Sequence, residues 1–142
     1  MKNSTELLYV ISGEDFSSAG EASTSFKNEL KKLDVPADII RRASIAMYEG
    51  EINMVIHAYG GTARVTVDDS DITIVLSDNG PGIENVDLAM QAGYSTATDG
   101  IRDLGFGAGM GLPNMKKYSD EMTIETKEGE GTTVTMVVHI NT

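Results

Sequence analysis

Three polar residues recur at a spacing of four along a segment that is otherwise apolar. Glu49, Asn53 and His57 lie within residues 37–59, which we expect to form one long helix. Because an α-helix turns every 3.6 residues, this spacing places the three side chains on one face. Apolar residues occur on nearly every other side, which predicts that the helix is buried. A buried polar stripe is unfavourable unless it meets polar partners, and a bound magnesium nucleotide would be such a partner.

A second group of candidate residues lies in the glycine-rich stretch from residue 78 to residue 112. It opens with DNGPG (78–82) after an apolar strand and closes with LGFGAGMGL (104–112) at the predicted start of a helix. Such glycines let the backbone move or approach a ligand closely. The start of a helix offers N–H groups and a favourable dipole to phosphate. The stretch therefore predicts a nucleotide site with a mobile lid over about residues 93–111.

Two familiar phosphate-binding motifs are missing from the sequence. A P-loop requires Lys-Ser or Lys-Thr after its last glycine, and no glycine of this chain is followed by either pair. The dinucleotide fingerprint GxGxxG, if it begins at Gly105, needs a glycine where Met110 stands. The predicted nucleotide site therefore belongs to neither of these classes.

Composition limits the classes of function. The 142 residues are enough for one domain with a single core, so we expect one domain over 1–142. A formal net charge of −11 argues against non-specific binding to nucleic acid or to anionic membranes. The chain has no cysteine, and the lack of a long apolar run leads us to expect neither a signal peptide nor a membrane span. We therefore expect a cytoplasmic protein.

Hydrophobic periodicity predicts five strands and several helices. Apolar alternation or apolar runs indicate strands at residues 7–11, 63–67, 72–76, 122–127 and 132–140. Helical spacing indicates helices at about 17–33, 37–59 and 84–91, and another one that begins near Pro113. Ser18 and Glu21 form a capping-box pattern at the first helix. The predicted fold class is an α/β two-layer sandwich, in which helices cover one face of a mixed, mainly antiparallel sheet.

Four sequence blocks occur in order, at the spacing of one domain. They are E-x-x-x-N (Glu49 and Asn53), DNGPG (78–82), GFGAGMGL (105–112) and GTTVT (131–135). Together they resemble the GHKL superfamily of histidine-kinase-like ATPases, which share the Bergerat ATP-binding fold. The resemblance covers nearly the whole chain from Pro36 onward. Within the superfamily, the chain is similar to the small bacterial anti-sigma factors and serine-protein kinases (RsbW and RsbT types), and looks closest to the RsbT type.

The resemblance implies a role for each of these residues. Asn53 would bind Mg²⁺ through its side-chain oxygen, and Glu49 would be the general base that takes a proton from a serine hydroxyl or a water. Asp78 would accept a hydrogen bond from the adenine amino group, and Thr132 would hold adenine through water. The glycines would bring the backbone close to the nucleotide: Gly80 and Gly82 at the base, and Gly105, Gly107, Gly109 and Gly111, with Leu112, at the phosphates.

The resemblance leaves two functions open. One is an ATP- and Mg²⁺-dependent serine/threonine protein kinase that phosphorylates a STAS-type antagonist protein. The alternative is an anti-sigma factor, or another nucleotide-modulated binding switch, without significant kinase turnover; a homodimer also stays open. The cation for the γ-phosphate could be Arg102, Lys116 or Lys117. Glu51 points to nearly the opposite side of the helix from Glu49, and we expect it to be solvated.

Overall fold

The computed structural model describes residues 4–12, 19–57, 60–79, 111–127 and 129–140. Within them the chain forms five strands and three helices. In chain order these are β1 (Thr5–Ser12), α1 (Glu21–Lys32), α2 (Ala37–His57), β2 (Gly60–Val67), β3 (Asp71–Ser77), α5 (Gly111–Tyr118), β4 (Glu121–Lys127) and β5 (Gly131–His139). All five predicted strands are present. The predicted helix at 84–91 lies outside the described residues.

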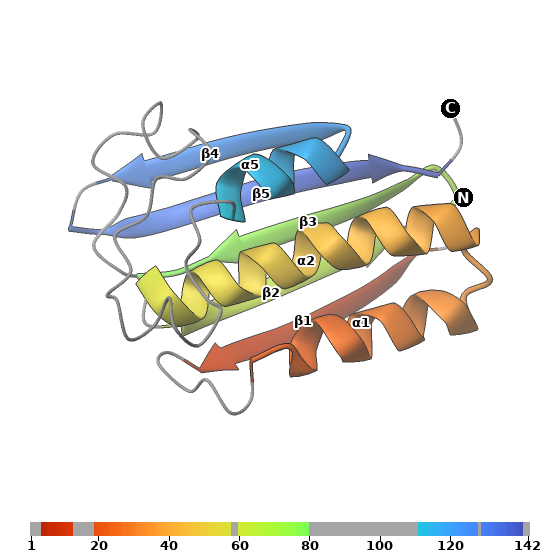
Figure 1. Ribbon diagram of the computed structural model, residues 1–142, viewed down its shortest axis with the longest axis horizontal. Coiled ribbons are helices and arrows are strands. Elements are labelled where there is room, and N and C mark those ends of the chain that lie inside the picture. Colours follow the sequence, from red (N-terminus) through yellow and green to blue (C-terminus); the bar gives the residue numbers. More distant parts are fainter. Residues whose placement is uncertain (1–3, 13–18, 58–59, 80–110, 128, 141–142) are drawn as a thin grey trace.

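The five strands form one sheet in the order β1-β2-β3-β5-β4. Each neighbouring pair of described strands is antiparallel. Side chains of a strand point alternately to the two faces of a sheet, and in β3 the alternate residues Ile72, Ile74 and Leu76 are buried. The three helices all lie on one face (Figure 1). The predicted two-layer sandwich with a mainly antiparallel sheet is therefore confirmed, and the described strands include no parallel pair.

Helix α2 lies between α1 and α5 and packs along the middle of the sheet (Figure 1). Its side chains Met47, Met54 and Val55 are buried in the common core. A Cβ atom at Gly50 would lie only 2.2 Å from Cδ1 of Leu76. Glycine at this position therefore allows α2 to lie directly on β3. The residues on either side of Gly50 are thereby held at a fixed height above the sheet.

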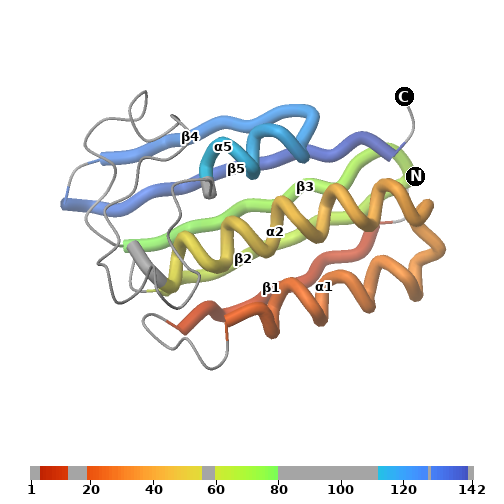
Figure 2. The backbone as a smooth tube through the Cα atoms, viewed as in Figure 1, coloured from red at the N-terminus to blue at the C-terminus, as the bar shows by residue number. Residues whose placement is uncertain are grey.

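Several elements that carry predicted site residues meet at one end of the sheet. The C-terminal part of α2, the end of β3 and the start of β5 all lie at this end (Figure 2). The backbone confirms the proximity of the two strands beyond the last ladder pair, because the N–H of Asp78 donates to the carbonyl of Thr132 at 3.0 Å. The fold therefore brings the residue after β3 next to the second residue of β5.

Helix α1 begins later than the capping-box pattern predicted. Its first residue is Glu21, and its N-cap is Gly20 with φ 98°, which makes no side-chain capping hydrogen bond. A capping box with Ser18 at the N-cap would put Glu21 in the third helical position, so that prediction is wrong. The N–H groups at this helix start bond instead to a side chain from α2, as described below.

Candidate functional site

The first predicted site residue, Glu49, lies half-buried on α2 and faces α5. Its Oε1 accepts a hydrogen bond from Nδ2 of Asn114 at a length of 3.4 Å. Burial raises the pKa of the Glu49 carboxyl above its usual value, and the hydrogen bond from Asn114 offsets part of this effect. A carboxylate that is partly withdrawn from water and held by an amide can accept a proton from a nearby hydroxyl.

Asn53 lies one helical turn after Glu49, and its side chain is also half-buried. The spacing of four residues puts both side chains on the same face of α2, at the end of the helix that approaches the end of β3 (Figure 1). Within the described residues the Asn53 side chain has no hydrogen-bond partner. The structure therefore places one carboxylate and one amide side by side, as the sequence predicted.

Asp78 and Thr132 form a second part of the site. In addition to the backbone bond already described, Oδ1 of Asp78 accepts a hydrogen bond from the N–H of Thr132 at 3.3 Å. The hydroxyl groups of Thr132 and Thr126 lie 2.9 Å apart, and Thr132 is buried. These contacts fix the orientation of the Asp78 carboxylate at the end of β3.

The close approach of the two strands depends on Gly131. Its φ of 116° lies in a region that side chains disfavour, and a Cβ there would be 2.1 Å from the carbonyl oxygen of Asp78. The first position of the GTTVT block therefore requires glycine for a structural reason. Gly131 lets β5 pass directly beside Asp78 and Asn79, which follow β3.

Part of the predicted phosphate-binding segment can be placed. Gly111 is the first residue of α5, and Leu112 is buried in its first turn. Lys116 and Lys117 are exposed in the last turn, at the other end of α5. The other glycines proposed for the phosphates and the base lie outside the described residues; they are Gly80, Gly82, Gly105, Gly107 and Gly109. Arg102 and the rest of the predicted lid also lie outside them.

Glu51 corrects a prediction. It was expected to be solvated, but its exposed fraction is only 2%. Its Oε1 accepts the N–H of Ser23 at 2.9 Å, and its Oε2 accepts the N–H groups of Gly20 at 2.9 Å and of Ala22 at 3.3 Å. The side of α2 opposite Glu49 faces the start of α1 and not water. Glu51 therefore satisfies the helix N-terminus that lacks a cap of its own.

Sequence reasoning also missed Asn114 and Thr126. Asn114 lies in the first turns of α5, between the buried residues Leu112 and Met115. A polar residue between two apolar residues that pack inward is the signal that could have identified it. Thr126 contacts Thr132 only because β4 pairs with β5 in the observed register. No local pattern indicates that contact before the pairing is known.

Within the described part of the chain, no group of three or more His, Cys, Asp or Glu side chains is placed to hold a metal ion. The same part contains no helix with the length and apolar character needed to cross a bilayer.

Comparison with known proteins identifies the class. Residues 40–142 match the family described as histidine kinase-, DNA gyrase B-, and HSP90-like ATPase. The match covers more than half of the chain, and the chain therefore belongs to this family of ATPases. The resemblance seen in the four sequence blocks is confirmed.

Individual relatives indicate a narrower group. The chain is 31% identical over 141 residues to an anti-sigma F factor of Clostridium acetobutylicum, covering 96% of this chain and 93% of the relative. It is 33% identical over 143 residues to an anti-sigma F factor of Caldanaerobacter subterraneus subsp. tengcongensis, covering 97% and 94%. Both relatives are named as anti-sigma factors, one of the two kinds of protein in the predicted group. Neither is named as a kinase of the RsbT type, to which the sequence blocks looked closest.

A solved structure shows the same fold. The RsbU and RsbW domains of a Mycobacterium tuberculosis protein match with a TM-score of 0.64 at 16% identity. The match covers 94% of this chain but only 32% of that one. At this identity the similarity concerns the fold alone.

Proposed function

We propose that this chain is a single-domain, ATP-binding regulatory protein of a bacterial partner-switching module. In this proposal it transfers phosphate to a serine or threonine of a STAS-type antagonist protein, and residues 93–111 form the lid over the nucleotide. Membership of the ATPase family and the anti-sigma F names of its relatives support the general role. The arrangement of Glu49, Asn53 and Asp78 supports the finer assignment.

The end of β3 suits adenine. A fixed carboxylate is an acceptor for an exocyclic amino group, and Asp78 is held by the N–H of Thr132. The hydroxyl groups of Thr126 and Thr132 add polar groups at the same place. Gly131 allows β5 to approach Asp78 closely there. These residues fit the base of ATP, and Asp78 would select adenine through its amino group.

The start of α5 and the Asn53 side chain suit the phosphates. Helix α5 begins at Gly111 and has no acidic residue in its first turn, so its N–H groups and dipole favour an anion. Asn53 supplies a neutral oxygen, the type of ligand that Mg²⁺ takes together with phosphate oxygens and waters. We assign Asn53 to Mg²⁺, and Gly111 with Leu112 to the phosphate chain. The glycines at 80, 82, 105, 107 and 109 retain their predicted roles.

The single observation that supports a kinase most directly is the setting of Glu49. Its carboxylate is half-buried, has a raised pKa, is held by Asn114 and stands one turn before Asn53. Bound Mg-ATP would supply the phosphoryl group to be transferred, and ADP would be the leaving group. Glu49 would orient the acceptor hydroxyl and take its proton, which makes the oxygen a better nucleophile.

Transfer of the labelled γ-phosphate of ATP to the STAS-domain proteins of the source organism tests this function. The wild type should label one of them in the presence of Mg²⁺, and Glu49→Gln should lower the rate by about a hundredfold or more. Glu125→Gln, which changes an exposed glutamate of β4, is the matched control and should keep the wild-type rate. Equal rates for Glu49→Gln and the wild type would refute the role of Glu49.

An anti-sigma factor without significant turnover is the second candidate. The names of the relatives, which align over almost their whole length, favour it. Co-purification with each sigma factor of the source organism tests it. A stable complex formed equally by the wild type and by Glu49→Gln, with no labelling of any STAS-domain protein, would establish binding without catalysis. The absence of a complex with every sigma factor would count against it.

A further inference from the structure

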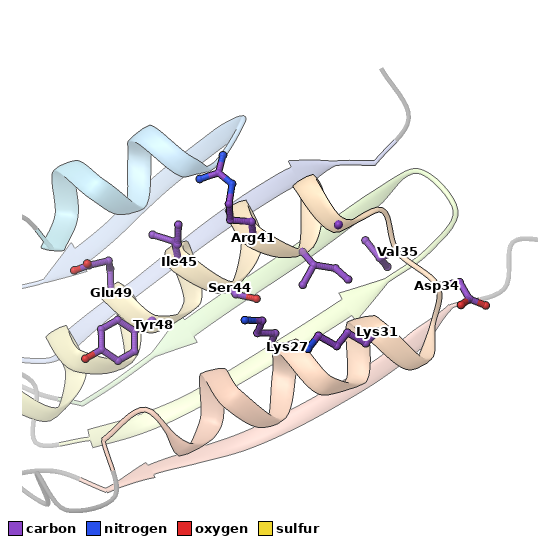
Figure 3. Close-up of a pocket in the computed structure, with 11 residues that line it drawn as sticks. Lys27, Lys31, Asp34, Val35, Arg41, Ser44, Ile45, Tyr48 and Glu49 are labelled. Carbon is purple, nitrogen blue, oxygen red and sulfur yellow. The ribbon is translucent and has the colours of Figure 1, made fainter.

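A groove runs between the outer surfaces of α1 and α2 and ends at Glu49. Its volume is about 770 Å³, and no role of the proposed nucleotide site accounts for it. Lys27 and Lys31 line it from α1, and Arg41, Ser44 and Tyr48 line it from α2 (Figure 3). We call this feature the α1–α2 groove. It is open to solvent on the side of the helix layer that faces away from the sheet.

The groove is basic on a chain that is strongly acidic. The formal net charge of the chain is −11, yet three cationic side chains line this one groove. Lys27 and Lys31 are exposed and form no ion pair within the described residues. Arg41 pairs with Asp38 at 3.6 Å, but both side chains are more than half exposed, so this pair is easily opened. Lys27 and Lys31 are therefore available to an anionic ligand, whereas the Arg41 guanidinium lies over the ring of Tyr118, 6.0 Å from its centroid.

Between the cations the groove offers apolar contact and an unsatisfied hydroxyl. Tyr48 is 42% exposed, and Ile45 lies one turn before Glu49 on the same outer surface of α2. The Oγ atom of Ser44 is buried and has no hydrogen-bond partner in the described part of the chain. Together these groups suit a peptide segment with acidic residues and at least one apolar residue.

Two carboxylates mark the ends of the groove. Asp34 lies at the end near the turn between the helices, and Glu49 lies at the end near the proposed nucleotide site. The α2 residues from 37 to 48 span about 17 Å, because each step along the helix adds about 1.5 Å. An extended peptide of about six residues has the same length. A segment of this size could occupy the groove and leave the following residue beside Glu49.

We propose that the α1–α2 groove binds an acidic, extended segment of the phospho-acceptor protein. The segment lies next to the hydroxyl that is presented to Glu49, and its carboxylates pair with Lys27 and Lys31. Charge complementarity and the continuity of the groove with Glu49 favour this occupant over a second copy of the acidic chain. The inference rests on the proposed function, since it names how the protein substrate of the same site is recognised.

A titration with two matched peptides tests the groove without knowledge of the natural partner. The probe is an octapeptide with glutamates around one leucine and one serine, and its control has glutamine in place of every glutamate. Titrated into the ¹⁵N-labelled full chain, the acidic peptide should shift amide signals of residues that line the groove. The glutamine peptide should bind about tenfold more weakly, and added salt should weaken only the acidic peptide.

Charge-reversal variants identify the cations. Lys27→Glu with Lys31→Glu should weaken binding of the acidic peptide by about tenfold. Lys32→Glu with Lys127→Glu makes the same change in net charge at residues that pair with Glu29 and Glu130 and do not line the groove. That control should bind within about twofold of the wild type. Equal losses in the two double variants, shifts located elsewhere or no shift in millimolar peptide would overturn the proposal.

The peptide titration and the test of the function can fail separately. Glu49→Gln leaves the lysines intact and removes one negative charge from the end of the groove, so it should not weaken binding of the acidic peptide. Should the chain transfer no phosphate while the groove residues still bind the peptide, the kinase assignment alone would fall. For an acceptor protein that is labelled, reversal of Lys27 and Lys31 should raise KM and leave kcat unchanged. An unchanged KM would overturn the proposed role of the groove and leave the kinase assignment unaffected.

Discussion

Glu51, in the middle of α2, accepts a hydrogen bond from the backbone N–H of Ser23 in the first turn of α1, and the two atoms lie 2.9 Å apart. The same carboxylate accepts two further N–H groups, from Gly20 and Ala22. The N-terminus of α1 is therefore attached to the helix segment that also presents Glu49. This contact links two helices that are joined in sequence only at their other ends.

Replacement of Glu51 by alanine should destabilise the protein. The change leaves three N–H groups at a largely buried helix start without their acceptor, and we expect a loss of about 2–3 kcal/mol in the free energy of unfolding. Urea denaturation followed by circular dichroism measures it. Glu125→Ala, at an exposed position of β4, should cost no more than about 0.5 kcal/mol. Equal costs for the two variants would show that the Glu51 contacts contribute nothing.

Gly131→Ala should be more harmful than Gly129→Ala. Both glycines have positive φ, 116° and 79° respectively, so both variants store backbone strain. At Gly129 the added Cβ would meet nothing within 4 Å, and we expect a cost of about 1 kcal/mol. At Gly131 it would collide with the carbonyl oxygen of Asp78, so we expect more than about 2 kcal/mol.

The same pair of glycine variants tests the link between fold and nucleotide. Because Gly131 positions β5 beside Asp78, Gly131→Ala should also weaken ATP binding at temperatures where the variant is folded, and Gly129→Ala should not. Urea denaturation and nucleotide titration on the same samples measure both effects. Similar stability and similar ATP affinity in the two variants would contradict the account of the β3–β5 approach.

Loss of the Asn114 side chain should change the pH dependence of phosphate transfer. Burial raises the pKa of Glu49, and the hydrogen bond from Asn114 lowers it, so Asn114→Ala should raise this pKa further. Transfer needs the deprotonated base and is therefore lost as pH falls through the pKa of Glu49. The acid limb of the rate profile should then move to higher pH in Asn114→Ala. Asn28→Ala, on the exposed face of α1, should leave the limb in place.

His139 should make stability depend on pH. The hydrogen bond with Asp71, at 2.5 Å, raises the pKa of His139, and the charges of Asp120 and Glu121 act in the same direction. A raised pKa means that the folded state binds the proton more tightly. This contribution is fully present below the unfolded value of about 6.5 and is lost as pH rises through the folded pKa.

His139→Gln tests that assignment. The difference in Tm between wild type and variant should be largest in mildly acidic buffer and should shrink as pH rises. Asp71→Asn removes the main cause of the shift and should give a similar profile. A difference in Tm that stays constant across this range would show that the titration of His139 does not contribute to stability.

The fold was largely predictable because its signals are local. Strict alternation in β3 and β5, such as Ile72, Ile74 and Leu76, reports directly which face of the sheet is buried. The helix boundaries near Pro36 and Pro113 follow from residue chemistry as well. Antiparallel pairing of strands joined by short turns then determines most of the sheet.

The contacts that sequence reasoning missed are all non-local. Glu51 was assigned to solvent because its spacing from Glu49 gives only a direction around α2, and not what lies in that direction. The answer depends on where α1 packs, 28 or more residues away in sequence. Similarly, Asn114 reaches Glu49 across 65 residues, through the packing of α5 on α2. The family resemblance implied the roles of the site residues, but only the packing reveals what holds them in place.

Calorimetric titration of ATP, with and without Mg²⁺, is the decisive test of the proposed nucleotide site. The wild type should bind ATP more tightly with Mg²⁺, Asn53→Ala should lose the effect of Mg²⁺, and Asp78→Asn should lose ATP binding. Asp38→Asn, at a surface position of α2 with 74% side-chain exposure, should bind as the wild type does. If the folded wild type bound no ATP, or if Asp78→Asn bound it unchanged, the proposed nucleotide site would be wrong.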